Sequence, residues 1–271
     1  MVFCCCYWGT WLVPDNPSLA MKSRFLGQSA FRLYKFILAV YFLFWCVYWP
    51  AGEGVTDAGQ FVTYWTFYVG AIYFIVSTIT ACGILGTNMS PKMSLYPERE
   101  DTMVERGSAN LSAFGRFVMW LQIFSWNVAC LSSLIVVTVF WGLLFEGGPL
   151  SSVDINAHIL IAIIMVIDQF LVATKFTMKQ LLAAELFGAL YITFNIIFYF
   201  TAPKEDRLLY DILNWEEEPA AAVIYTVVIL LVLLPMFSAI HLGVFSLREH
   251  TYNSFVKQPT SLEHEGNMNF P

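Results

Sequence analysis

Charged residues are scarce in this sequence, and their scarcity indicates the class of the protein. Asp, Glu, Lys and Arg make up 13% of the 271 residues, against about a quarter in soluble domains. Apolar residues make up 58%, aromatic residues 17%, and the mean hydropathy is +0.63. A soluble protein of this length has too little core to bury so much apolar surface. The composition therefore excludes a disordered chain, a collagen and a soluble enzyme, and it indicates a polytopic membrane protein.

Several motifs are also missing. The sequence has no phosphate-binding glycine loop, dinucleotide fingerprint, HExxH or GxSxG, which excludes the common ATPase, dehydrogenase, zinc-protease and α/β-hydrolase patterns. The six cysteines lack zinc-finger spacing and do not suggest a disulfide framework. The net charge of −6 argues against nucleic acid as a partner. We expect neither a cofactor nor a bound metal.

Three cysteines stand together near the start of the chain, at Cys4, Cys5 and Cys6. They precede a short aromatic and apolar stretch, a context typical of S-palmitoylation. The alternative is an unmodified interfacial anchor made by the aromatic residues. Both interpretations stay open.

Long apolar runs predict the fold. A membrane-crossing helix needs about 20 mostly apolar residues, and six candidate runs occur at 34–49, 61–85, 117–145, 157–176, 181–202 and 220–247. They lack the alternation of barrel strands, so we expect an all-α transmembrane bundle over 34–247. An N-terminal segment, 1–33, and a polar tail, 248–271, flank it. Pro235 predicts a kink in the last helix.

Basic residues predict the orientation of this bundle. Twelve of the 14 Lys and Arg residues fall in the segments on one side of the six runs, and such an excess marks the cytoplasmic side. Both termini are then cytoplasmic. The sequons at Asn88 and Asn110 fall on that side and should carry no glycan. The expected location is the plasma membrane or the endoplasmic reticulum.

Two side chains are candidates for catalysis. Thr63 lies near the start of the second run and His158 near the start of the fourth, and both runs enter from the same side, so the two residues share one depth. A threonine hydroxyl needs an adjacent base to act as a nucleophile, and neutral imidazole is such a base. The alternatives are structural. Thr63 continues a small-residue packing face with Thr66, Gly70 and Ser77, and His158 is an interfacial histidine bonded to a loop carbonyl.

Two acids lie within the apolar runs. Asp168 is ten residues, about 15 Å of helix, from His158 and therefore does not orient it. We expect it to form a hydrogen bond or ion pair inside the bundle, with Asn127 or Gln122 as candidate partners, or to be protonated. Glu185 is interpreted in the same way. The functional alternative is a proton or ion path through both acids.

The sequence resembles the rolling stone family of multi-pass membrane proteins, which is associated with myoblast fusion, over about residues 25 to 252. The segments that carry the resemblance are Phe31-Arg32-Leu33-Tyr34, Phe61-Val62-Thr63-Tyr64-Trp65, Trp120-Leu121-Gln122 with Trp141, Asn156-Ala157-His158 with Ile167-Asp168, and Leu209-Tyr210-Asp211-Ile212-Leu213-Asn214-Trp215. The resemblance implies a membrane process such as cell fusion, acting through protein partners.

That family is in turn similar to the androgen-induced membrane hydrolases, which cleave fatty-acid esters with an intramembrane threonine and a histidine. Thr63 stands eight residues before Ala71 and an aromatic stretch, as the hydrolase threonine does, and His158 precedes the Ile167-Asp168 pair. The sequence departs from these hydrolases at Tyr64-Trp65. The resemblance implies that Thr63 is a nucleophile and His158 a base.

Three functions are consistent with the sequence. The first is a rolling stone-like membrane protein with a membrane protein partner. The second is an intramembrane hydrolase of lipid esters that uses Thr63 and His158. The third is a small transporter that uses Asp168 and Glu185. The lipid bilayer is a partner in all three.

Overall fold

The computed structural model describes residues 17–53, 59–83, 112–145, 147–176 and 181–255. Over these residues the regular structure is helical, apart from one isolated bridge between Ser23 and Val172. Cys4, Cys5 and Cys6 and the sequons at Asn88 and Asn110 lie outside the described residues.

Six helical spans in the described part of the chain are long and apolar enough to cross a membrane, which confirms the predicted number. They are Gln28–Ala51, Val62–Ala81, Ala113–Leu144, Ser152–Leu171, Leu181–Thr201 and Pro219–Phe255. The chain is therefore a multi-pass membrane protein with an all-α fold.

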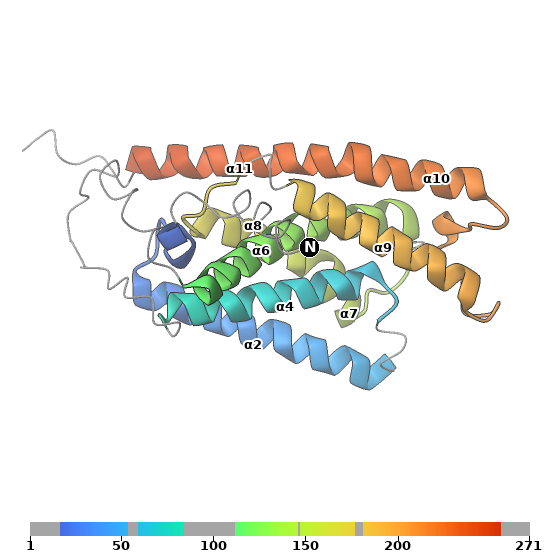
Figure 1. Cartoon of the computed structure of the whole chain (residues 1–271), viewed down its shortest axis with the longest axis horizontal. Coiled ribbons are helices and arrows are strands. Elements are labelled where there is room, and N and C mark those ends of the chain that lie inside the picture. The colour runs from blue at the N-terminus through green and yellow to red at the C-terminus, as the bar shows by residue number, and fades with distance from the viewer. Residues whose placement is uncertain (1–16, 54–58, 84–111, 146, 177–180, 256–271) are drawn as a thin grey trace, which may run out of the picture.

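The spans are built from eight α-helices and three π-helical turns. The α-helices are α2 (Gln28–Glu53), α4 (Val62–Ala81), α6 (Ala113–Val139), α7 (Ser152–Ile155), α8 (Ile161–Leu171), α9 (Leu181–Thr201), α10 (Pro219–Val228) and α11 (Leu234–Phe255). The π turns are η2 (Phe140–Leu144), η3 (Asn156–Leu160) and η6 (Ile229–Leu233). Figure 1 shows α10 and α11 running on as one long helix, with α2 and α4 side by side across the bundle.

Several predicted helix ends were wrong. The second span ends at Ala81 rather than 85, the third begins at Ala113 rather than 117, and the fourth ends at Leu171 rather than 176. The first span begins at Gln28 rather than 34, because the charges of its first turns have partners inside the protein: Arg32 Nε donates to the Ala81 carbonyl at 2.8 Å, and Lys35 pairs with Asp168. The fourth span begins at Ser152 rather than 157, because Ser151 and Asp154 form a capping box ahead of it. The last helix continues to Phe255 rather than 247.

The small-residue face of α4 packs inward, as predicted. Thr66 and Ser77 are buried, and the ring of Phe42 from α2 lies against Gly70. A Cβ atom at Gly70 would lie 2.6 Å from Phe42 Cε1, so glycine allows the two helices to approach closely.

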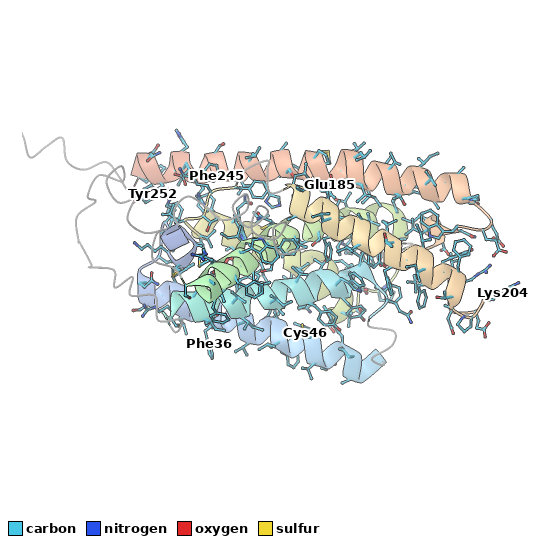
Figure 2. All side chains as sticks on the ribbon, viewed as in Figure 1. Phe36, Cys46, Glu185, Lys204, Phe245 and Tyr252 are labelled. Atoms are coloured by element: carbon cyan, nitrogen blue, oxygen red, sulfur yellow. The ribbon has the colours of Figure 1, made fainter. Side chains whose placement is uncertain are left out.

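The outer surface of the bundle is apolar, as expected of a surface that faces lipid. Phe36 projects from α2 (Figure 2), and Val47 on the same helix and Leu231 on η6 are also exposed. The kink predicted at Pro235 stays a prediction; the structure has the π turn η6 there, which ends two residues before the proline. Proline has no N–H to donate to the preceding turn, and a π turn accommodates that loss.

Candidate active site

Thr63 and His158 meet inside the bundle. Thr63 is the second residue of α4, His158 lies in η3, and the distance between Thr63 Oγ1 and His158 Nε2 is 3.4 Å. A productive hydrogen bond between a nucleophile and a base spans about 2.6–3.2 Å and is often looser before substrate binds. The equal depth of the two residues and the inward face of α4 together account for this contact.

Aromatic packing orients the His158 ring. Phe140, from η2, stacks on it with ring centroids 3.5 Å apart and an interplanar angle of 2°. Tyr41, from α2, donates its hydroxyl proton to Asn156 Oδ1, at the start of the π turn that carries His158, over 2.7 Å. Nδ1 of His158 has no well-formed hydrogen bond to any described residue. The stacked ring and the anchored π turn hold His158 beside Thr63.

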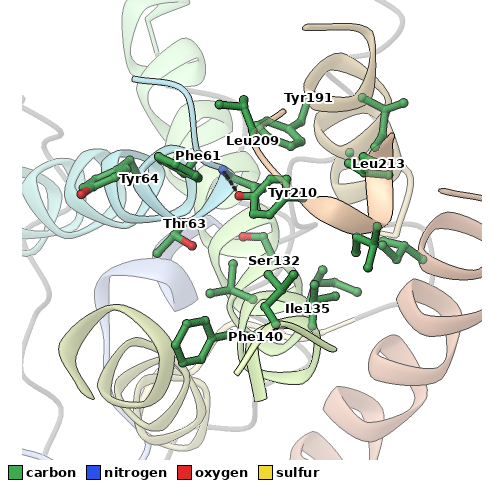
Figure 3. A pocket seen from close by; sticks show the side chains of 18 of the residues that line it. Phe61, Thr63, Tyr64, Ser132, Ile135, Phe140, Tyr191, Leu209, Tyr210 and Leu213 are labelled. Atoms are coloured by element: carbon green, nitrogen blue, oxygen red, sulfur yellow. Dashed lines mark hydrogen bonds between the residues drawn. The ribbon is translucent and has the colours of Figure 1, made fainter. Parts of the chain in front are cut away.

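A cavity of about 400 Å³ opens beside the pair. Thr63, His158, Tyr210 and Asp211 give it a polar end, and the rest of its wall is mostly apolar, with Ile135, Val136, Phe187, Leu230 and Leu234 among its residues. Figure 3 shows side chains from several helices enclosing this space. Its size lies in the range of about 300–1,000 Å³ typical of small-molecule sites. A largely apolar cavity with a few polar groups at one end suits an amphipathic lipid.

All three π turns of the described chain contribute to this cavity. Phe140 and Leu144 come from η2, His158 from η3, and Leu230 from η6. An extra residue in a helical turn redirects the side chains that follow it, and such turns occur frequently at functional sites. Their convergence on one cavity supports a function there.

The segment between α9 and α10 closes the polar end of the cavity. Tyr210, just before the short 3-10 helix η5 (Asp211–Leu213), accepts the backbone N–H of Val62 at 3.1 Å. Two further hydrogen bonds tie the segment to α9: Trp215 Nε1 donates to Asn195 Oδ1 at 2.9 Å, and Tyr199 O–H donates to Asn214 Oδ1 at 2.7 Å. Burial raises the pKa of the Tyr210 phenol to about 12, so the phenol stays protonated at neutral pH.

Asp168 does not belong to this cavity. Its carboxylate pairs with the buried Lys35, and the Tyr73 hydroxyl donates to it at 2.5 Å. The candidate partners named from the sequence, Asn127 and Gln122, were wrong: Asn127 Nδ2 donates to the Ile123 carbonyl, and Gln122 bonds to neighbours that include Thr80. The partner is Lys35 of α2 instead.

Glu185 lies apart from this ion pair. It is half-buried on α9 (Figure 2) and is not one of the residues that line the cavity.

Sequence reasoning missed Tyr210 and Lys35. Tyr210 lies in a connecting segment, where no periodicity reports the position of a side chain. A signal for Lys35 was present, because a single lysine surrounded by apolar residues needs an anionic partner inside a membrane protein.

The described residues contain no group of three His, Cys, Asp or Glu side chains able to hold a metal ion. Comparison with known proteins adds no assignment, because no family model, no curated protein and no solved structure matches the chain.

Proposed function

We propose that this protein is an intramembrane hydrolase of lipid esters, with Thr63 as the nucleophile and His158 as the general base. The observation that carries the proposal is the 3.4 Å contact between Thr63 Oγ1 and His158 Nε2 at the polar end of a largely apolar cavity. The cavity accepts the acyl chain, and the polar end holds the ester group.

The reaction has two halves. Thr63 Oγ1 attacks the acyl carbonyl carbon while its proton passes to His158 Nε2, and the carbonyl π electrons move to the oxygen. The resulting oxyanion re-forms the C=O bond and breaks the bond to the alkoxide, which leaves as an alcohol with the proton from His158. Water then attacks the acyl-Thr63 ester, with His158 again taking the proton, and collapse releases a carboxylic acid and returns the proton to Thr63. The net change is an ester and water to an acid and an alcohol.

The orientation of the bundle and its family are part of the same proposal. The excess of basic residues at the other end supports an orientation with the Thr63 end on the outer side of the membrane, where water is available for the second half of the reaction. The rolling stone resemblance is consistent with a six-helix membrane protein, and we propose membership of that family. A role in membrane fusion would then follow from altered lipid composition or from a protein partner.

The transporter alternative receives less support. A path for protons or ions needs acids that exchange freely along it, whereas Asp168 is held by Lys35 and Tyr73 with no exposed surface.

The test is turnover of long-chain lipid esters by the purified protein in nanodiscs. Thr63→Ala and His158→Ala should each lower kcat by at least about a thousandfold, and Thr63→Ser should keep part of the activity. Thr66→Ala is the matched control, because Thr66 lies one turn further along α4 and its hydroxyl has no hydrogen-bond partner among the described residues. Unchanged turnover in Thr63→Ala would exclude the proposed function.

A further inference from the structure

Ester cleavage at Thr63 needs a hydrogen-bond donor for the oxyanion. Negative charge develops on the carbonyl oxygen in both halves of the reaction, and loss of one donor for it typically lowers kcat by about 10²–10³. Neither Thr63 nor His158 can fill this role, because both are engaged in the proton transfer. The donor must come from another group at the polar end of the cavity.

Most polar side chains at this end are already committed. Ser132 Oγ donates its proton to the Val128 carbonyl at 2.6 Å, and the Tyr191 hydroxyl donates to the Gln60 carbonyl at 2.9 Å. Asp211 is an acceptor when ionised. Tyr64 packs edge-on against Trp49, and Figure 3 shows its hydroxyl directed away from that of Thr63.

Tyr210 lies at the start of α4, beside the residue that carries the nucleophile. Its oxygen accepts the Val62 N–H, one residue before Thr63, and its ring packs edge-on against Phe61 at 5.7 Å. Figure 3 shows the Tyr210 hydroxyl on the side of the cavity where the Thr63 and Ser132 hydroxyls lie. The N–H that it accepts lies at the positive end of α4, and accepting a hydrogen bond strengthens a hydroxyl as a donor.

The Tyr210 proton is free to turn toward substrate. Its oxygen accepts the Val62 N–H through a lone pair, which leaves its own O–H proton to donate. The Tyr191 hydroxyl, also at the cavity wall, gives its one proton to the Gln60 carbonyl. Rotation about the Tyr210 C–O bond can direct the Tyr210 proton to a carbonyl oxygen next to Thr63.

We infer that Tyr210 is a catalytic residue whose O–H group binds the oxyanion formed when Thr63 attacks a lipid ester, an inference that rests on the proposed function. Tyr210 keeps its proton throughout. It donates a hydrogen bond as the carbonyl π electrons move to the oxygen, and this bond weakens when the C=O bond re-forms. The segment between α9 and α10 thus supplies a catalytic group as well as closing the cavity.

The test is Tyr210→Phe in the full-length protein in nanodiscs, a change that keeps the ring against Phe61. We expect kcat to fall about 10²–10³-fold, with KM within about twofold. A long-chain trifluoromethyl ketone, which forms an oxyanion adduct with the nucleophile, should lose affinity by the same factor as kcat/KM. An ether analogue of the substrate, which has no carbonyl oxygen, should bind unchanged.

Tyr199→Phe is the matched control. It removes a phenol hydroxyl that anchors the same segment through Asn214 but does not line the cavity, so kcat should stay near wild type. If Tyr210→Phe and Tyr199→Phe lowered kcat equally, and if the trifluoromethyl ketone and the ether analogue lost affinity by the same factor, Tyr210 would have only a structural role. That result would overturn the inference. An active Tyr210→Phe protein alongside an inactive Thr63→Ala protein would overturn the inference and leave the hydrolase function standing. Full turnover by Thr63→Ala, or none by wild type, would remove both.

Discussion

Lys35 Nζ forms an ion pair with Asp168 in the centre of the bundle, across 133 positions of sequence. Neither side chain has any exposed surface. The Tyr73 hydroxyl accepts a hydrogen bond from Lys35 at 2.6 Å and donates one to Asp168 at 2.5 Å. One polar cluster therefore joins α2, α4 and α8, and α8 continues directly from the π turn that carries His158.

Breaking this ion pair should destabilise the fold. Lys35→Met leaves the Asp168 carboxylate buried without its cation, and loss of one partner of a buried pair typically costs about 3–5 kcal/mol. The double variant Lys35→Met/Asp168→Leu removes both charges and should recover most of the loss. Denaturant unfolding in detergent micelles measures both effects.

Glu185→Gln is the control for this prediction. Glu185 is only half-buried, so the change should alter the unfolding free energy by no more than about 0.5 kcal/mol. If the double variant were as unstable as the single one, the pair would contribute through packing rather than charge.

The number of spans could be predicted from the sequence, but their ends could not. Runs of apolar residues report the thickness of the bilayer, and this signal depends little on tertiary contacts. The ends depend on single side chains that find distant partners: Arg32 reaches the Ala81 carbonyl, and Ser151 caps the fourth span with Asp154. Such partners are known only once the helices are packed.

The depth of the candidate site in the membrane could be predicted from the sequence, but the rotation of each helix about its own axis could not. The shared entry side of two spans places Thr63 and His158 at one level, whereas the 3.4 Å contact depends on how each helix is turned. The stack of Phe140 on His158 could not be predicted either, because the two residues lie in two different π turns, η2 and η3, which the sequence pattern does not reveal. Tyr210 lies in a segment whose path is set by side-chain hydrogen bonds rather than by periodicity.

Orientation in the membrane is the second prediction. Of the 12 basic residues assigned to the cytoplasmic side from the sequence, Lys35 and Arg248 are buried, and the remaining ten still outnumber the two on the other side. Glu218→Cys introduces a cysteine at the Thr63 end of the bundle. In intact cells, or in sealed vesicles whose outer face is the extracellular one, this cysteine should react with a maleimide that does not cross the membrane. The native Cys82, exposed at the opposite end of α4, should react only after permeabilisation, and labelling in the reverse order would invert the topology.

Phe140 should control the rate through the orientation of His158. Aromatic stacking is worth about 0.5–1.5 kcal/mol, and about 1.4 kcal/mol corresponds to a tenfold change in rate. Phe140→Leu should therefore lower kcat up to about tenfold, and Phe140→Tyr should restore it because the stacked ring returns. Phe145→Leu serves as control, since Phe145 packs on Phe140 and Trp141 and does not line the cavity. A similar loss in both leucine variants would show that general packing, rather than the stack on His158, sets the rate.

Gly188 should set the length of acyl chain that the cavity accepts. A Cβ atom at this position of α9 would lie 2.6 Å from Leu230 Cδ2 and 3.8 Å from Leu234 Cδ1, and both leucines line the cavity. In Gly188→Ala the flexible end of Leu230 must move, and we expect it to move into the space of the acyl chain. The helix itself tolerates the change, because alanine is favoured over glycine in a helix by about 1 kcal/mol.

The expected result is a change in substrate preference without loss of the fold. Each methylene group that no longer fits loses about 0.8 kcal/mol of apolar burial, so exclusion of one or two should lower kcat/KM about four- to fifteenfold. Long-chain esters should show this loss and short-chain esters should not, in assays of a homologous ester series. Gly243→Ala on α11 is the matched control, because a Cβ atom there meets no other atom within 4 Å. An unchanged chain-length profile in Gly188→Ala would show that the acyl chain lies elsewhere, whereas a shift confined to long chains would place it between α9 and η6.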